Sequence, residues 1–347
     1  MSAVNLFSFH FLPKKINSSF NKKVSILIPV RNEEDNIINL LTQLKSFSYS
    51  NFEVIIYNDN SDDSTREVVE TFILKEDRFT LINGQALPIG WLGKNHACHH
   101  LSLKAKGDFL LFLDADVKVK DGLLERALQH ITKHHLDLLS IFPKQQFGSI
   151  GEKISVPLMN WILLTLLPLI LIRKHKLPAF SAANGQFMMF NSEVYNRVLP
   201  HKLFKKNAVE DIAIIREFKN QKLKCDTLLG SEYIQCRMYS GIGESINGFS
   251  KNIVQFFGNN LLLTIAFGII TSLAPIVVFY EIGLIWGLIY LAGIMFIRFL
   301  VSLASKQSVV QNVLLLPLQQ MVFMAIIVRR IVGKTKNNIE WKGRKIA

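Results

Sequence analysis

The sequence predicts an α/β domain followed by helices that cross a membrane. Three observations support this. Strand-like and helical runs alternate between residues 24 and 82, a fully apolar strand ends in an acidic pair at 114–116, and long apolar runs gather beyond residue 252. A β-α-β-α-β alternation is typical of an open, mostly parallel sheet with helices on both faces. Apolar runs near 20 residues are long enough to span a bilayer.

The first strand is expected at Val24–Val30, a β-rich apolar run. The acid-rich turn 31–35 follows it, and acids in a first helical turn suit the positive helix end. A helical pattern then puts four apolar residues on one face: Ile37, Ile38, Leu41 and Leu44.

The second strand is expected at Phe52–Tyr57 and a short third strand at Phe79–Ile82. The polar turn 58–65 lies between them and predicts a helix capped from Ser64 or Thr65. Asp59 then lies at the carboxyl edge of the second strand.

The run from Phe109 to Leu113 is apolar at every position and predicts a strand buried on both faces. It delivers Asp114 and Asp116, which share one face because side chains alternate along a strand. The carboxyl edge of a parallel sheet is where α/β folds bind ligands. Two carboxylates there suit Mg²⁺ or Mn²⁺, and the metal in turn holds a diphosphate. Taken alone, the tripeptide equally fits a strand end with a solvated acidic turn.

The segment 91–100 brings Lys94 and His96 to the start of a predicted helix, after the flexible Gly93. Positive charge at a helix N-terminus would suit a diphosphate; surface basic residues at an ordinary helix start are the alternative. Further on, Glu210 and Asp211 open an amphipathic helix. They fit a catalytic base facing a cleft and, equally, ordinary first-turn acids.

The formal net charge is +13, and part of it lies in a basic C-terminal stretch. Basic residues beside membrane spans stay on the cytoplasmic side. We therefore interpret the charge as a membrane signal and expect no nucleic-acid partner, because no recognition motif is present. The three cysteines show no zinc or redox spacing.

Four apolar stretches are candidates for lipid contact. Residues 154–172 could span by length, but one crossing would separate Asp116 from Asp211, so we expect an interfacial helix or hairpin; a buried core helix is the alternative. The other stretches are expected at Leu261–Tyr280, Ile282–Ala304 and Val309–Val328. Whether two or three of these cross stays open, and Arg298 in the second is a charge that is either functional or snorkels to the interface.

The motifs together resemble a known family. The blocks at 24–34, 58–65 and 114–116, in this order, resemble family 2 glycosyltransferases of the GT-A fold. The block Trp-Leu-Gly-Lys-Asn-His-Ala-Cys at 91–98 is similar to the branch acting on isoprenoid lipids, which includes the diaponeurosporenoate and hopanoid-associated glycosyltransferases. The resemblance covers about residues 22–258.

The resemblance implies a role for each matching residue. Asp116 would hold Mn²⁺ or Mg²⁺ on the donor diphosphate, and Asp211 would be the catalytic base. The family commonly has an Asp-Asp pair where this chain has Asn58 followed by Asp59. The difference puts in doubt only the role of the first residue of the pair. The donor-binding residues are expected to be Pro29, Arg31, Glu33, Asp59, Lys94, Asp114 and Arg237.

We therefore expect a membrane-bound inverting glycosyltransferase that moves a sugar from a nucleotide-sugar, a UDP-sugar, to a lipid acceptor such as a carotenoid. The alternatives are transfer to polyprenyl phosphate or a cell-envelope glycolipid, and a non-catalytic scaffold. A nucleotidyltransferase is disfavoured because residues 30–34 lack glycine.

The expected organisation has four parts, and the catalytic part is expected on the cytoplasmic side of the inner membrane of a multi-pass protein. They are a short segment 1–21, a catalytic domain 22–258, a transmembrane region 259–328 and a basic cytoplasmic tail 329–347.

Overall fold

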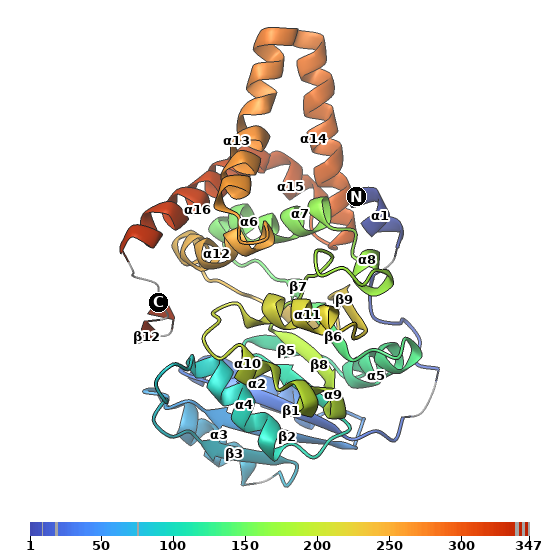
Figure 1. Ribbon diagram of the computed structural model, residues 1–347, viewed down its shortest axis with the longest axis vertical. Helices are drawn as coiled ribbons and strands as arrows, with labels where there is room; N and C mark the ends of the chain where they lie inside the picture. Colours follow the sequence, from blue (N-terminus) through green and yellow to red (C-terminus); the bar gives the residue numbers. More distant parts are fainter. Residues whose placement is uncertain (9, 18–19, 75, 337–339, 342–343, 346–347) are drawn as a thin grey trace. The chain divides into compact units, whose positions relative to one another are not determined.

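The computed structural model describes residues 1–8, 10–17, 20–74, 76–336, 340–341 and 344–345. The chain forms two compact units (Figure 1). The sheet unit comprises His10–Lys144 and Leu169–Cys236. The helical unit comprises Met1–Phe9, Gln145–Pro168 and Arg237–Ala347. The helical unit thus collects three separate stretches of the chain. The predicted tail residue Lys342 lies outside the described residues.

The sheet unit is built on a seven-stranded sheet of order β3-β2-β1-β4-β8-β6-β9. Its strands are β1 (Val24–Val30), β2 (Phe52–Asn58), β3 (Phe79–Asn83), β4 (Phe109–Leu113), β6 (Leu138–Phe142), β8 (Phe187–Asn191) and β9 (Cys225–Leu229). Neighbouring strands are parallel except where β8 runs antiparallel to β4 and β6. A second, three-stranded sheet has the order β5 (Val117–Val119), β10 (Ile234–Cys236) and β7 (Lys144–Gln145), and β5 and β10 pair antiparallel. The mostly parallel sheet expected from the sequence is confirmed.

Three strands are covered on both faces, because every residue of β4, β6 and β9 is buried. A strand buried on both faces needs apolar side chains in both directions, which explains the unbroken apolar run of β4. The helices of this unit are α2 (Glu34–Lys45), α3 (Thr65–Ile73), α4 (Gly93–Lys104), α5 (Leu123–Lys133), α8 (Ile170–Lys174), α9 (Ser192–Val198), α10 (Pro200–Leu203) and α11 (Glu210–Asn220).

Two local predictions differ from the structure. The buried stripe of α2 contains Leu40, whereas Ile38 is exposed. Positions 37, 40, 41 and 44 follow the i, i+3, i+4, i+7 spacing of one helix face, and position 38 falls outside it. Ser64 occupies the N-cap of α3, but its side chain makes no capping hydrogen bond. The hydroxyl of Thr65 instead accepts from the backbone N–H of Glu33, so it ties two turns together.

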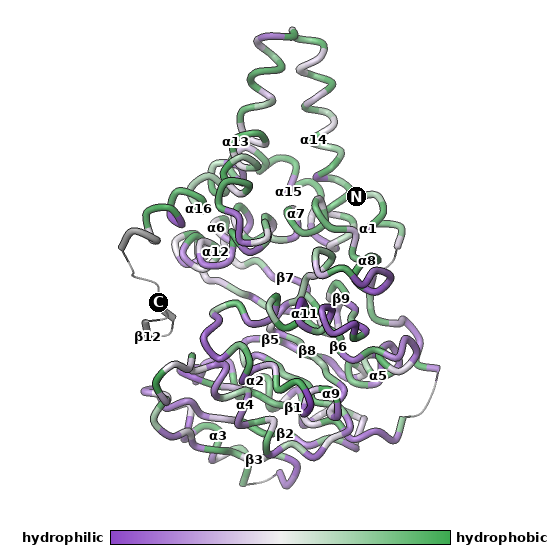
Figure 2. Tube along the Cα trace, in the orientation of Figure 1, coloured by the Kyte–Doolittle hydropathy of each residue, from purple (hydrophilic) through white to green (hydrophobic). Residues whose placement is uncertain are grey.

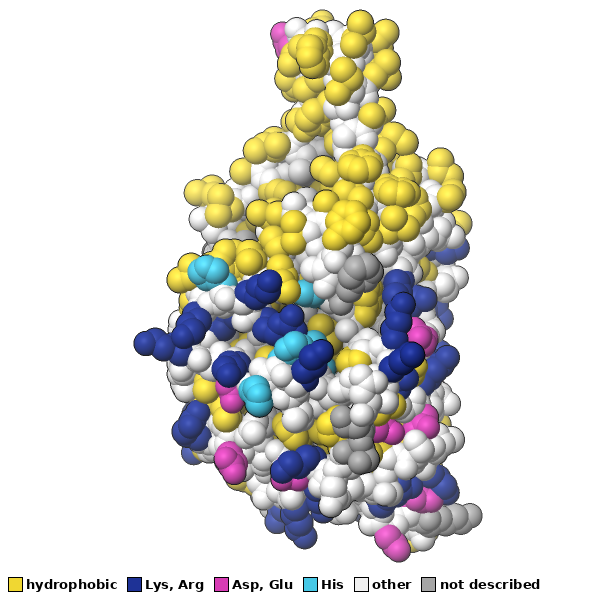
Figure 3. Space-filling view, turned by 90° about the vertical axis from the view of Figure 1, so that its right-hand side faces the viewer, with side chains coloured by type: hydrophobic (Ala, Val, Ile, Leu, Met, Phe, Trp, Pro, Cys, Tyr) yellow, Lys and Arg dark blue, Asp and Glu magenta, His cyan; other side chains and the backbone are white. Residues whose placement is uncertain are grey.

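The helical unit contains the long apolar helices. Its helices are α1 (Ser2–Phe7), α6 (Ile150–Ser155), α7 (Pro157–Leu166), α12 (Ile242–Phe256), α13 (Leu261–Val277), η1 (Val278–Ile282), α14 (Leu284–Ala304), α15 (Val309–Leu314) and α16 (Leu316–Lys336); a short pair, β11 (Glu340–Trp341) with β12 (Arg344–Lys345), follows. Figure 1 shows α13 and α14 side by side as a hairpin joined through η1. Hydrophobic residues dominate this hairpin and cover its surface (Figures 2 and 3).

Within the described part of the chain, three helices are long and apolar enough to cross a membrane: Leu261–Ile282, Leu284–Ala304 and Leu316–Gly333. The first two agree with the sequence, but the third predicted span, Val309–Val328, is wrong in its bounds. The helix is interrupted at Leu315, between α15 and α16. Ser308 caps α15 by accepting from the N–H of Gln311, and Pro317 stands in the first turn of α16, where a proline is tolerated.

The apolar stretch 154–172 is divided rather than continuous. All residues from Pro157 to Leu164 in α7 are buried, as the buried-helix alternative requires, and the helix ends before Pro168. The amide of Asn5 in α1 donates to the carbonyls of Leu164 and Leu167, at 2.9 and 2.8 Å. These bonds satisfy carbonyls that the end of α7 leaves unpaired. An interfacial location for this stretch stays a prediction.

Gly107 provides a test of how β4 is held. A Cβ at this position would lie 2.6 Å from the backbone nitrogen of Ser25 and 2.9 Å from the carbonyl oxygen of Lys23. We expect Gly107→Ala to lower the free energy of unfolding by about 1–3 kcal/mol, because the backbone must shift to relieve the overlap. Thermal unfolding in detergent measures this. Gly243→Ala, in α12 with open space around it, is the control and should be neutral or stabilising; equal losses in both variants would contradict the prediction.

Candidate active site

Polar side chains gather at the carboxyl edge of β1, β2 and β4. These parallel strands are neighbours, and the chain order reverses between β1 and β4. Such a reversal leaves a crevice outside the strand ends, where ligands of α/β folds bind. Arg31 follows β1, Asp59 follows β2 and Asp114 follows β4. The structure therefore brings these three predicted residues to one edge.

Arg31 fastens the turn after β1 to the turn after β2. It is 9% exposed, and its guanidinium donates to the carbonyl of Asp59 at 2.7 Å and to the carboxylate of Asp62 at 3.0 Å. The N–H of Asp59 donates back to the carbonyl of Val30 at 2.9 Å. Asp59 is 3% exposed. Arg31 thus holds the loop that carries Asp59, in addition to any contact with a donor. Pro29, one residue before the end of β1, pairs with Tyr57 of β2.

Lys94 is the positive charge of the site. Its ammonium lies 2.8 Å from an oxygen of Asp114 and 3.5 Å from Glu210, so it joins the end of β4 to the start of α11. Burial alone would lower the pKa of Lys94, but the charges of Asp114 and Glu210 outweigh it and raise the pKa well above its usual value. Lys94 is therefore a permanent cation. Its predicted contact with a diphosphate stays a prediction.

Asp116 lies beside Asp114 in a half-buried position. The amide nitrogen of Gln186 is 3.4 Å from both of its carboxylate oxygens, and the thiol of Cys236 is 3.6 Å away. Burial, and then the charges of Asp114 and Glu33, raise the pKa of Asp116 to about 6. These acids concentrate negative charge in one place, and a bound divalent cation would neutralise part of it.

The donor set fits a hard divalent cation that keeps open positions. No cluster of three His, Cys, Asp or Glu side chains that could hold a metal exists among the described residues. Mg²⁺ commonly takes one or two carboxylates and completes its shell with water and phosphate oxygens. Asp116, with Asp114 held by Lys94, matches that pattern.

Asp211 stands one residue into α11, half-buried, next to Glu210. It accepts from the backbone N–H of Gly185 at 3.0 Å. Burial, and then the charge of Glu210, raise the pKa of Asp211 to about 7, although the N–H groups of Ile212 and Gly185 oppose the rise. A carboxylate with this pKa can accept a proton near neutral pH.

The turn before β8 contributes no residue to the predicted site, yet it connects the site. A Cβ on Gly185 would lie 3.2 Å from the ammonium of Lys94, 3.4 Å from Glu210 and 3.7 Å from Asp211. Gln186, next in the chain, reaches Asp116. The Asn-Gly-Gln tripeptide before an apolar strand was the available signal, and only the fold shows what it contacts.

Arg237 belongs to the helical unit and is engaged there. Its guanidinium makes a bidentate ion pair with the fully buried Glu152, at 2.8 and 3.0 Å. The hydrogen bonds from Arg237, which outweigh the effect of burial, lower the pKa of Glu152 to about 2. Glu152 also completes a capping box with Ser149 at the start of α6. Arg237 therefore has a structural role, and its predicted contact with a diphosphate stays a prediction.

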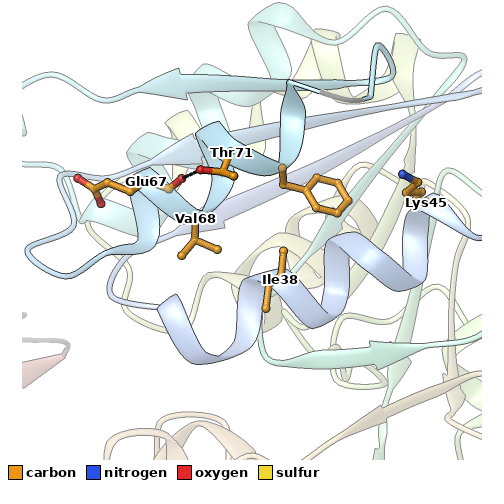
Figure 4. A pocket seen from close by; sticks show the side chains of 6 residues that line it. Ile38, Lys45, Glu67, Val68 and Thr71 are labelled. Atoms are coloured by element: carbon orange, nitrogen blue, oxygen red, sulfur yellow. Dashed lines mark hydrogen bonds between the residues drawn. The ribbon is translucent and has the colours of Figure 1, made fainter.

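A surface pocket of about 490 Å³ lies between α2 and α3 (Figure 4). Ile38 and Lys45 of α2 face Val68 and Thr71 of α3 across it. It contains none of the residues placed in the candidate site, so it is not part of that site.

Comparisons with known proteins agree with this geometry. The model of the family described as "Glycosyl transferase family 2" matches residues 25–199. A 4,4'-diaponeurosporenoate glycosyltransferase of Staphylococcus haemolyticus (strain JCSC1435) is 26% identical over 243 residues, which are 69% of this chain and 63% of that protein. The protein of the same name from Staphylococcus aureus (strain USA300) is 27% identical over 255 residues, 70% of this chain and 64% of that protein. The chain thus spans less than two thirds of the length of these relatives.

Among solved structures, the mannosyltransferase PcManGT from Pyrobaculum calidifontis, in complex with GDP-Man and Mn²⁺, is similar with a TM-score of 0.59. The match covers 93% of this chain and 92% of that one, at 14% sequence identity. At this identity the likeness concerns the fold alone.

Removal of the Lys94 charge tests its place in the site. We expect Lys94→Met to lower the free energy of unfolding by about 1–3 kcal/mol, because the carboxylates of Asp114 and Glu210 lose their partner while partly buried. Denaturant unfolding in detergent measures the loss. Lys45→Met removes the ion pair of the exposed Lys45 with Glu76 and should cost clearly less than the loss of Lys94. Equal losses of unfolding free energy in the two lysine variants would contradict the place of Lys94 in the site.

Proposed function

The chain belongs to glycosyl transferase family 2, whose model matches half of it, and on this premise we propose that it is a membrane-bound enzyme that transfers a sugar from a nucleotide-sugar to a lipid. The mixed sheet, together with the likeness to a solved glycosyltransferase, bears out the GT-A fold expected from the sequence. The observation that carries the proposal is the convergence of Asp114, Lys94 and Asp211 at the carboxyl edge of the sheet.

The donor is proposed to be a UDP-sugar. Asp59, buried at the end of β2, is proposed to contact the base, and Arg31 keeps the loop of Asp59 in place. Pro29 and Glu33 are proposed to border the nucleotide. The related mannosyltransferase structure holds GDP-Man and Mn²⁺, which supports a nucleotide-sugar donor in a site of this fold.

A divalent metal held by Asp116 would neutralise charge on the departing nucleotide diphosphate. The chain's own residues do the rest. Asp211 removes the proton from an acceptor hydroxyl while the hydroxyl oxygen attacks the anomeric carbon of the sugar. The attack is in line with the departing nucleotide diphosphate, so the configuration at this carbon inverts. The N–H of Gly185 holds Asp211 in position. Lys94 forms an ion pair with Asp114 at the strand end.

The acceptor is proposed to be a lipid, with an isoprenoid such as a carotenoid preferred. Two observations support this: the apolar helices of the helical unit, and the relatives named as diaponeurosporenoate glycosyltransferases. Transfer to a polyprenyl phosphate or to a cell-envelope glycolipid is the alternative within the same reaction class. We propose that the catalytic part faces the cytoplasm and that α13 and α14 cross the inner membrane.

Nucleotide binding is the first test. We expect UDP with Mn²⁺ to raise the thermal unfolding midpoint of the full chain in detergent, and we expect Asp116→Asn to lose this shift. At a ligand concentration of 100 times Kd, binding stabilises by about 2.7 kcal/mol. Asp35→Asn, an exposed carboxylate of α2, is the control and should keep the shift. A shift of the midpoint with GDP or CDP but not with UDP would assign a different nucleotide to the donor. No shift with any of the three nucleotides would favour a non-catalytic scaffold.

The pH dependence of transfer tests the base. We expect kcat/KM to rise with pH through about 7, because Asp211 accepts a proton only when ionised. Glu210→Gln removes the charge that raises the pKa of Asp211, so its acid limb should move to lower pH. Asp211→Asn should cost on the order of 10²–10⁴ in rate with a hydroxyl acceptor. Near-full activity of that variant would instead identify an acceptor that is already ionised, such as a carboxylate.

A further inference from the structure

Arg298 is the one charged residue between Glu281 and Lys306, and it lies inside α14, an apolar helix long enough to span a membrane. It is 3% exposed, so its side chain is buried within the protein. It lies six residues, or about 9 Å of helix rise, before α14 ends at Ala304. A charge at this depth is costly and calls for a partner.

The surroundings of Arg298 fix its guanidinium. The guanidinium carbon lies 4.1 Å from the ring centre of Trp161 in α7, in a cation–π arrangement. One terminal nitrogen donates to the side-chain oxygen of Gln319 at 3.1 Å. Gln319 is fully buried, and its own nitrogen donates to the carbonyl of Lys153 and to Asn312, so its oxygen is held towards Arg298. The group is therefore preorganised.

Among the described residues of this unit, no acidic side chain forms an ion pair with Arg298. The helical unit carries four acidic residues, Glu152, Glu244, Glu281 and Glu340. Glu152 is engaged by Arg237, and Glu244 accepts from Ser240. Glu281 precedes α14, and even the first residue of α14 is roughly 21 Å of helix rise from Arg298. Across the described residues of the whole chain, Arg298 makes no ion pair, and its Nε is buried without a hydrogen-bond acceptor. A neutral amide and an aromatic face only partly offset a buried charge.

We propose that Arg298, Trp161 and Gln319 form a binding site for the oxyanion head of an acidic lipid, and specifically for a carboxylate at the end of an apolar chain. A guanidinium fork pairs with a carboxylate through two hydrogen bonds, and Arg298 has donors left for both. A phosphodiester offers similar oxygens, but it would carry its polar headgroup about 9 Å below the helix end. A terminal carboxylate buries no further polar group.

This site goes beyond the transfer reaction, because lipid binding here needs no donor. Its failure would leave the proposed function untouched, and the reverse also holds. Trp161 also contacts the rings of Phe267 and Phe323, so the surroundings of the guanidinium are apolar apart from Gln319.

The test uses the full chain in a neutral detergent and the probes oleate, oleyl alcohol and dioleoyl phosphatidylglycerol. We expect oleate to bind saturably and to raise the thermal unfolding midpoint. Oleyl alcohol has the same chain without the charge and should give at least tenfold weaker binding. Oleate binding that is no tighter than oleyl alcohol binding overturns the proposal. Equal affinity for phosphatidylglycerol overturns the carboxylate assignment and identifies a bilayer phospholipid as the ligand.

Two variants make the test specific. Arg298→Met removes the charge and should weaken oleate binding at least tenfold. Gln319→Glu keeps the side-chain shape and places an internal carboxylate beside Arg298; this variant should stay folded and lose the oleate response. Arg329→Met, an exposed arginine of α16 bonded to Asn247, controls for general attraction and should bind oleate as the unaltered chain does. An undiminished oleate response in Gln319→Glu would refute the site even if Arg298→Met fails to fold.

Discussion

The ion pairs of Lys94 are the interaction on which the sheet edge depends. Four carboxylates, from Asp114, Asp116, Glu210 and Asp211, come from elements far apart in the chain. Two like charges about 4 Å apart repel by about 4 kcal/mol at the effective dielectric of a partly exposed site. The ammonium of Lys94 lies between the first and third of these acids, and it holds β4 and α11 together where repulsion would part them. Burial, and after it the charges of neighbouring acids, raise the pKa values of Asp116 and Asp211, so part of the repulsion remains. Catalytic chemistry at such an edge is possible because one cation has already balanced part of the charge.

Much of the sheet could be predicted from the sequence, since buried parallel strands leave a strong local signal. Val24–Val30 matches β1 residue for residue, and Phe109–Leu113 matches β4. Asp59 and Asp114 followed as edge residues because parallel strands end at one edge. Helix faces were less certain: Ile38 and Leu40 are both apolar, and only packing against the sheet decides which is buried. The hydroxyl of Thr65 likewise bonds across to the preceding turn, a contact that no local capping rule contains.

Long-range partners could not be predicted from the sequence. Lys94 was expected to face a ligand, yet its nearest neighbours are acids that lie 20 and 116 positions further along the chain. Gly185 has no chemistry of its own, and its importance arises from the groups that surround its backbone. Arg237 was matched to a family segment, but its ion pair with Glu152 was invisible because a lone glutamate in an apolar stretch carries no sign of its partner. The third apolar helix was misplaced because the break at Leu315 depends on a cap and a proline acting together.

The discontinuous helical unit also sets an order on biosynthesis. Helix α1 contacts both α7 and α14, and its Asn5 bonds to the carbonyls at the end of α7. About 280 residues separate α1 from α14. At 5–20 residues per second, α14 leaves the ribosome roughly 15–60 s after α1. The whole sheet unit has therefore been synthesised before α14, the last helix that α1 contacts, is made. Helix α1, with Val4 and Phe7 exposed even in the finished fold, lacks its contacts with α14 during that interval, so a membrane surface or a chaperone would have to cover its apolar side chains until α14 is made.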